Sequence, residues 1–311
     1  MLHQIFLNVC LPLLVMMGVG WGLDRKFSID LNSLVKLNIY CFVPAFIFHR
    51  LASSELAGET AIRVVAFTVC VIASMALGSW LIAKLCGYRR EQRTAMQLST
   101  MFYNSGNWGL PLLTLAYPTM GPVLQVFVLA TMNISTFTLG LALASADSQK
   151  GRGWRRFLPM LRQPSIYAII LGVLVRKFEI PVQEVVFIWK PLSYISAGLV
   201  GFALMTLGVQ LSKTKPPSLK GPISGALVLR LIGGPVIAAG LTLLFGFRGE
   251  MAAILIVGAA SPTAVNTALL AHEFGADSRF AAAVVFYSTL FAALIVTLLL
   301  ALLQWGVVPW A

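Results

Sequence analysis

The sequence predicts an all-α integral membrane protein with ten transmembrane helices, arranged as two inverted repeats of five. Three observations predict this fold. Of the 311 residues, 58% are hydrophobic and only 11% are charged, whereas a soluble domain is about a quarter charged. Apolar segments long enough to cross a bilayer follow one another along the whole chain. A helix-breaking motif lies in each half of the chain, at matching positions.

The apolar segments define the expected spans. A helix needs about 20 apolar residues to cross the hydrocarbon core of a bilayer. The sixth segment is the shortest, because Arg176 and Lys177 end its apolar run. The ten predicted spans are 4–22, 34–50, 61–86, 94–117, 122–145, 162–178, 189–211, 221–246, 250–271 and 279–305.

The distribution of lysine and arginine predicts the orientation. Loops on the side opposite the N-terminus hold 16 of these residues, and loops on the N-terminal side hold 6. Cytoplasmic loops carry the excess of basic residues. We therefore expect both termini to be extracytoplasmic in the cell (plasma or inner) membrane, with the loop 146–163 in the cytoplasm. The net charge of +12 then reflects topology, and the expected surroundings are the lipid bilayer, not nucleic acid.

An internal repeat relates the two halves. Residues 104–117 align without a gap on residues 261–274, at an offset of 157. Each half holds five predicted spans, and because five is odd, the second half inserts upside down. The predicted divisions are a first repeat over 1–146, a cytoplasmic linker over 147–163 and a second repeat over 164–311. Inverted repeats are typical of secondary transporters.

The two helix-breaking motifs are Asn104-Ser105-Gly106-Asn107-Trp108-Gly109-Leu110-Pro111 and Ser261-Pro262-Thr263-Ala264-Val265-Asn266. Proline lacks the N–H that a helix interior needs, and glycine weakens a helix. At bilayer depth, broken backbone is tolerated only where it is buried in protein or lines a watery cavity. Paired breaks in the two halves of a chain indicate the binding site of a secondary transporter.

The polar side chains at these breaks are the predicted substrate ligands. An asparagine amide can donate to a carboxylate or coordinate a cation without burying a charge. An isolated asparagine more often joins two helices, but its position beside a break favours binding. The half-helix N-termini freed by the prolines also suit an anion. The predicted substrate-binding residues are Asn104, Ser105, Asn107, Ser261, Thr263 and Asn266.

Arg230 is the only basic residue near the middle of a predicted span. The 11 acidic residues all lie in loops or at span ends, so no buried carboxylate is expected to pair with it. Arg230 can bond to backbone carbonyls, reach the cytoplasmic face or attract an anion electrostatically, and we favour a structural role. Gln210, close to the cytoplasmic end of its span, is interpreted as a capping residue.

The scarcity of ionisable groups within the spans also bears on coupling and chemistry. A proton relay needs Asp, Glu or His at membrane depth, so proton coupling is disfavoured. A sodium ion near Asn104, Asn107 and Thr263 remains open, and no other metal or cofactor is expected. The four cysteines have no metal-binding spacing. Without a cluster of His, Asp, Glu or Cys at membrane depth, an integral membrane enzyme is not predicted.

The chain resembles the auxin efflux carrier family, which includes plant PIN-FORMED carriers and bacterial proteins similar to malate and malonate permeases. The resemblance covers nearly the whole chain. Its strongest parts are residues 104–113 and residues 261–266 followed by 271–277. Shorter matches support it at 163–167, at 207–209, and at Arg230 with Pro235.

This resemblance implies a fold related to the bile-acid/sodium symporters, with spans 4 and 9 crossing at Gly109, Pro111 and Pro262. Spans 1, 2, 6 and 7 would form a scaffold and a homodimer interface, and spans 3–5 and 8–10 a moving transport domain. The family's carboxylate-binding asparagine falls on Asn104. Tyr103 stands where plant carriers have a proline, which favours organic anions in general over auxin in particular.

We therefore expect a secondary transporter of small organic anions, auxin-like or dicarboxylates such as malate and malonate. Its motion would be of the elevator type, with uniport as the simplest mode. A sodium- or proton-coupled symporter on the same fold is an alternative. An alternative of another class is a membrane receptor that binds the ligand without transporting it.

Overall fold

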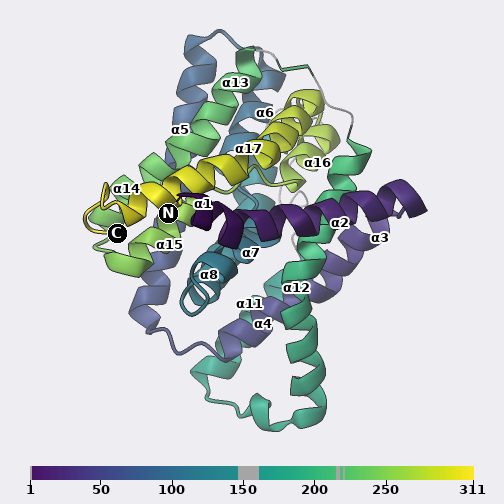
Figure 1. Ribbon diagram of the computed structural model, residues 1–311, viewed down its shortest axis with the longest axis vertical. Helices are drawn as coiled ribbons and strands as arrows, with labels where there is room; N and C mark the ends of the chain where they lie inside the picture. The colour runs from purple at the N-terminus through teal and green to yellow at the C-terminus, as the bar shows by residue number, and fades with distance from the viewer. Residues whose placement is uncertain (1, 146–160, 215–217, 220) are drawn as a thin grey trace.

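The computed structural model describes residues 2–145, 161–214, 218–219 and 221–311, and this part of the chain is almost entirely helical (Figure 1). Short π-helical turns continue several helices, at Phe6–Cys10, Asn38–Phe42, Ser105–Gly109, Thr136–Gly140 and Leu229–Gly233. The α-helices are α1 (Leu2–Ile5), α2 (Leu11–Phe27), α3 (Leu31–Leu37), α4 (Val43–Ala52), α5 (Gly58–Leu85), α6 (Arg90–Met101), α7 (Leu110–Ala116), α8 (Gly121–Ser135), α9 (Leu141–Ser145), α11 (Pro164–Lys177), α12 (Val186–Lys213), α13 (Gly221–Val228), α14 (Gly234–Leu244), α15 (Gly249–Ala259), α16 (Asn266–Glu273) and α17 (Ser278–Gln304).

Seven continuous helical stretches of the described residues have the length and composition to cross a membrane. They coincide with predicted spans 1, 2, 3, 5, 7, 8 and 10. The other three predicted spans correspond to the short helix α11 and to two interrupted helices, α6–α7 and α15–α16. The predicted linker lies largely outside the described residues, from 147 to 160. The seven stretches are Leu2–Phe27, Leu31–Ala52, Gly58–Leu85, Gly121–Ser145, Val186–Lys213, Gly221–Leu244 and Ser278–Gln304.

Helices α2 and α12 pack backbone against backbone. A Cβ atom added to Gly20 would overlap the carbonyl oxygen of Met205, and one added to Gly208 would overlap that of Met17. Small residues allow this close approach between membrane helices. Helix α4 packs against both α11 and α12, so helices from predicted spans 1, 2, 6 and 7 contact one another.

The remaining helices form a second set of contacts. Helix α5 packs against α6, α8 and α14, and α17 packs against α6, α13 and α16. Both interrupted helices lie within this set. In Figure 1, α6, α13 and α16 lie towards the top of the view, whereas α4 and α11 lie towards the bottom.

The two interruptions lie against each other. Helix α6 ends at Met101 and α15 ends at Ala259, and α6 is followed by extended chain, whereas α15 is followed by a turn at Ala260. Tyr103 and Thr263 form an isolated antiparallel bridge. The Asn104 N–H donates to the Pro262 carbonyl at 2.7 Å, and the Ala264 N–H donates to the Phe102 carbonyl at 3.0 Å. Backbone N–H and carbonyl groups in each interruption therefore find hydrogen-bond partners in the other interruption. Buried peptide groups require such partners.

Candidate functional site

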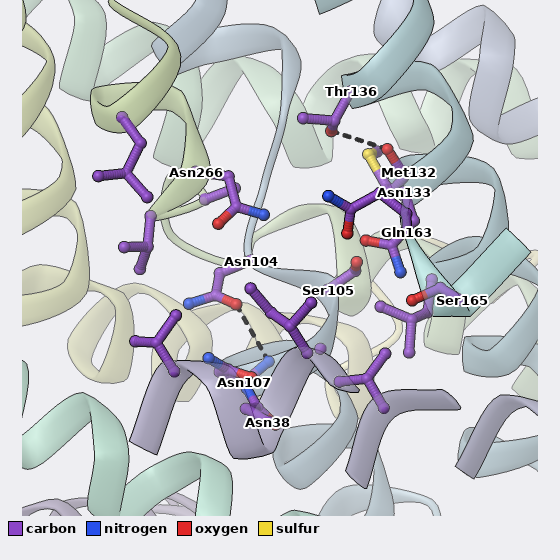
Figure 2. A pocket seen from close by; sticks show the side chains of 18 of the residues that line it. Asn38, Asn104, Ser105, Asn107, Met132, Asn133, Thr136, Gln163, Ser165 and Asn266 are labelled. Atoms are coloured by element: carbon purple, nitrogen blue, oxygen red, sulfur yellow. Dashed lines mark hydrogen bonds between the residues drawn. The ribbon is translucent and has the colours of Figure 1, made fainter. Parts of the chain in front are cut away.

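A cavity of about 120 Å³ lies beside the paired breaks (Figure 2). Residues from both breaks line it, together with residues from the Asn38–Phe42 turn, α8, α11, α12 and α16. Four hydroxyl-bearing residues besides Tyr103 also line it: Ser105, Thr136, Ser165 and Thr206. Its most distinctive feature is seven side-chain carboxamides, those of Asn38, Asn104, Asn107, Asn133, Gln163, Gln210 and Asn266.

No charged side chain is among the described residues that line this cavity. A water molecule needs about 10–15 Å³ of such volume, so the cavity has room for several waters or a small polar molecule. A carboxamide offers both N–H donors and a carbonyl acceptor. The wall can therefore hold a polar or anionic ligand by hydrogen bonds, without a formal charge of its own.

Asn104 is the best-defined part of the wall. Its side-chain oxygen accepts from the Asn107 N–H at 3.0 Å and so caps the helical turn that leads into α7 (Figure 2). Its backbone carbonyl accepts from the Gly109 N–H at 2.9 Å. The side-chain amide nitrogen, in contrast, is buried without a hydrogen-bond partner. A buried donor without a partner is costly, so this amide is poised to donate to a ligand or to water in the cavity.

The two neighbours of Asn104 in the first motif are also held in place. The Ser105 carbonyl accepts from the side-chain amide of Gln125 on α8 at 2.6 Å. The Asn107 side-chain oxygen accepts from the Asn38 amide at 2.8 Å. This bond occupies the Asn107 acceptor and leaves the two N–H donors of its amide for other partners. Trp108, fully buried, anchors the turn in the core.

Other carboxamides complete the wall. Asn266, the first residue of α16, lies on the same side of the close-up as Asn104 (Figure 2). Asn133, Gln163 and Ser165 lie on the opposite side (Figure 2). Polar groups from both halves of the sequence thus surround one space, and the N-terminal ends of both resumed helices lie beside it.

Ser261 and Thr263, also predicted as ligands, do not line the cavity. Both are fully buried. The Thr263 hydroxyl donates to the Ser99 carbonyl of α6 at 2.7 Å, and its N–H donates to the Ser288 hydroxyl at 3.0 Å. The Ser261 hydroxyl lies near Gly109, where an added Cβ would come within 3.0 Å of it.

The residues predicted to break the helices lie at the junction. The Pro262 carbonyl takes part in the pairing of the two breaks. Gly109 ends the π-helical turn, and Pro111 is the second residue of α7, directly after that turn.

Arg230 does not line the cavity either. Its guanidinium donates to the backbone carbonyls of Thr100 and Ala259, one of the structural roles considered from the sequence. No group of three or more His, Cys, Asp or Glu side chains placed to hold a metal occurs among the described residues. The sodium site considered near Asn104, Asn107 and Thr263 stays a prediction, and the Thr263 hydroxyl is already hydrogen bonded.

Four carboxamides of the wall were not predicted from the sequence: Asn38, Asn133, Gln163 and Gln210. The interpretation of Gln210 as only a capping residue is incomplete. The Thr214 hydroxyl donates to the Gln210 backbone carbonyl near the end of α12, and Gln210 also lines the cavity. All four lie within predicted spans, so a search for Asn and Gln inside the spans would have found them among others, without showing which of them share a cavity.

Comparisons with known proteins find similar transporters. Similar proteins include an uncharacterized transporter of Methanothermobacter thermautotrophicus, 25% identical over 90% of this chain and 89% of the relative. Another uncharacterized transporter, from Methanocaldococcus jannaschii, is 27% identical over 94% of this chain and 97% of the relative.

Two rice proteins, auxin efflux carrier component 3a and probable component 3b, are each 27% identical over 45% of this chain. That match covers 23% and 24% of their own lengths. The resemblance to auxin efflux carriers is thereby confirmed. Residues 5–152 and 156–300 match the membrane transport protein family, and with its series of span-length helices the chain is a multi-pass membrane protein of that family.

Proposed function

We propose that the protein is a secondary transporter of small organic anions that works by alternating access. The observation that carries this proposal is the cavity at the paired breaks, with seven carboxamides, no charged lining residue and the unpartnered amide nitrogen of Asn104. An anion bound there would accept from Asn104 and Asn107 and would lie beside the N-terminal ends of two helices, whose partial positive charge favours it.

The architecture proposed for this function has ten spans in two inverted repeats, with α6–α7 and α15–α16 crossing in the membrane. Contacts among α2, α4, α11 and α12 support their assignment to a scaffold, and the contacts around α5 and α17 support a separate transport domain. The transport domain would carry the cavity across the membrane in an elevator-type motion. We further propose a homodimer formed through the scaffold, with both termini extracytoplasmic.

The proposed substrates are small carboxylates, such as malate, malonate and auxin-like acids. The rice auxin efflux carriers are similar to 45% of this chain, but the neutral wall does not by itself select among carboxylates. Uniport is the simplest mode. Coupling to sodium or protons is the alternative that a gradient experiment decides.

The test is flux in proteoliposomes that contain the purified protein, with radiolabelled malate, malonate and indole-3-acetate, with and without sodium and pH gradients. Asn104→Ala removes the unpartnered donor, and Asn32→Ala removes an exposed asparagine of α3 as the matched control. We expect saturable flux that Asn104→Ala abolishes and Asn32→Ala preserves. Binding without flux would favour a receptor, and neither binding nor flux of any of the three acids would reject the proposed substrate class.

A further inference from the structure

Arg230 is a large, fully buried cation on the opposite side of the junction from the cavity. It belongs to the π-helical turn Leu229–Gly233 between α13 and α14, and its exposed fraction is 0%. One guanidinium nitrogen donates to the Thr100 carbonyl at 2.7 Å, and the other donates to the Ala259 carbonyl. Thr100 lies in the last turn of α6, and Ala259 is the last residue of α15. One side chain therefore joins the C-terminal ends of both interrupted helices.

The charges at this point balance without a carboxylate. Each helix C-terminus carries a partial charge of about −0.5 from its unsatisfied carbonyls. Two such ends facing one site sum to about −1, which the single positive charge of the guanidinium offsets. Arg230 makes no ion pair with any carboxylate in the part of the chain that the structure describes.

The surroundings of Arg230 accommodate this arrangement. A Cβ atom on Gly234 would overlap a guanidinium nitrogen and would lie 2.9 Å from the Ala259 carbonyl oxygen, so only glycine leaves room for the contact. On the cavity side, the guanidinium carbon lies 5.0 Å from the centre of the Tyr103 ring. Tyr103 also lines the cavity, so one residue contacts both the cation and the candidate binding site.

We propose that Arg230 is a built-in cation that replaces a coupling ion at this position. In transporters with discontinuous helices, half-helix C-termini and unwound carbonyls coordinate Na⁺. Here the same carbonyl groups are held by a guanidinium, which stays protonated in proteins. The position therefore needs no dissociable ion to hold the two half-helices together. That transport needs no coupling ion at this position rests on the proposed function. That the cation holds the two half-helices together does not.

The experiment removes the cation and offers a replacement. Arg230→Ala is purified in detergent micelles, and its thermal unfolding is followed in the chloride salts of guanidinium, methylguanidinium, sodium and choline, at equal low concentration. Arg248→Ala, at an exposed arginine, is the matched control. We expect the unfolding midpoint of Arg230→Ala to lie below that of the wild type and to rise in guanidinium, methylguanidinium or sodium relative to choline. The wild type and Arg248→Ala should respond equally to all four salts.

An equal response of Arg230→Ala to all four salts would overturn the proposal. If that variant does not fold, Arg230→Lys and Arg230→Met provide the second comparison. A required positive charge predicts a higher unfolding midpoint for the lysine variant, whereas a requirement for packing alone predicts that the methionine variant is equal or higher, and this second result would also overturn the proposal. Neither measurement depends on flux, so a failure of the transport proposal would be recognised separately.

Discussion

The two sides of the junction between the interrupted helices differ in chemistry. On the cavity side, helices resume at Ser105 and Asn266, and the polar groups are neutral carboxamides. On the other side, α6 and α15 end, and one buried guanidinium binds their carbonyls. Each break thus exposes a helix N-terminus to one side and a helix C-terminus to the other.

This difference follows from helix polarity, because one side of the junction presents carbonyl acceptors and the other presents N–H donors. Carbonyl groups at the C-terminal ends need donors, and the protein supplies them permanently with Arg230. Donors on the cavity side are left partly unsatisfied, as the buried amide nitrogen of Asn104 shows. We therefore expect substitutions on the cavity side to change anion binding, and substitutions on the arginine side to change stability.

The largest effect is expected for Asn104→Asp. The aspartate still accepts from the Asn107 N–H and caps the helix, but it replaces the free amide donor by a negatively charged oxygen. Loss of a hydrogen bond to a charged group costs about 1.5–3 kcal/mol, which corresponds to an affinity loss of about 10- to 150-fold, and repulsion adds to it. Flux and thermal unfolding are measured together. Normal flux in a normally stable variant would exclude Asn104 as a ligand.

An intermediate effect is expected for Gly234→Ala on the arginine side. The new methyl group collides with the guanidinium, and overpacking of this kind costs about 1–3 kcal/mol. Gly240→Ala in the same helix α14 is the control, because a Cβ added there would meet no neighbouring helix or side chain within 4 Å. Unfolding in denaturant should show a loss for Gly234→Ala alone, while the folded protein of both variants binds the anion normally. Equal stabilities would mean that the guanidinium is not tightly enclosed.

The smallest effect is expected for Thr263→Val. This change removes the hydrogen bond to the Ser99 carbonyl, which is worth about 1 kcal/mol, from a side chain that does not line the cavity. Flux per folded protein should stay at the wild-type level, and the thermal unfolding midpoint should fall slightly. A decrease in flux that is larger than the decrease in the amount of folded protein would place Thr263 in contact with the substrate. The two sides of the junction would then not differ in the way described.

The sequence predicted the positions of the breaks well, because Gly, Pro and Asn act locally. The first motif begins three residues after α6 ends at Met101, and the second begins two residues after α15 ends at Ala259. Local propensity, however, does not predict which side chains of an extended segment point towards the cavity. Alternate side chains of such a segment point to opposite sides. Thr263, chosen because it adjoins Pro262, consequently contacts α6 and not the cavity.

For about half of the carboxamide wall, the sequence shows an amide within a span but does not assign it to the site. Asn38 and Asn133 lie in helical stretches without a strong break, and there an isolated amide is usually a link between helices. Only the folded chain brings them to the motif around Asn104. A structural role was favoured for Arg230, but its partners could not be named from the sequence. They are carbonyl groups 130 and 29 residues away, and a sequence does not mark which carbonyls are free.

The neutral cavity wall has an electrical consequence. Because no described lining residue is charged, the loaded and empty forms of the proposed transporter would differ only by the charge of the anion. Moving one elementary charge through a potential of 100 mV is worth about 2.3 kcal/mol, which corresponds to about a fifty-fold concentration ratio. A membrane potential that is negative inside would then drive a monovalent anion outward without any coupled ion.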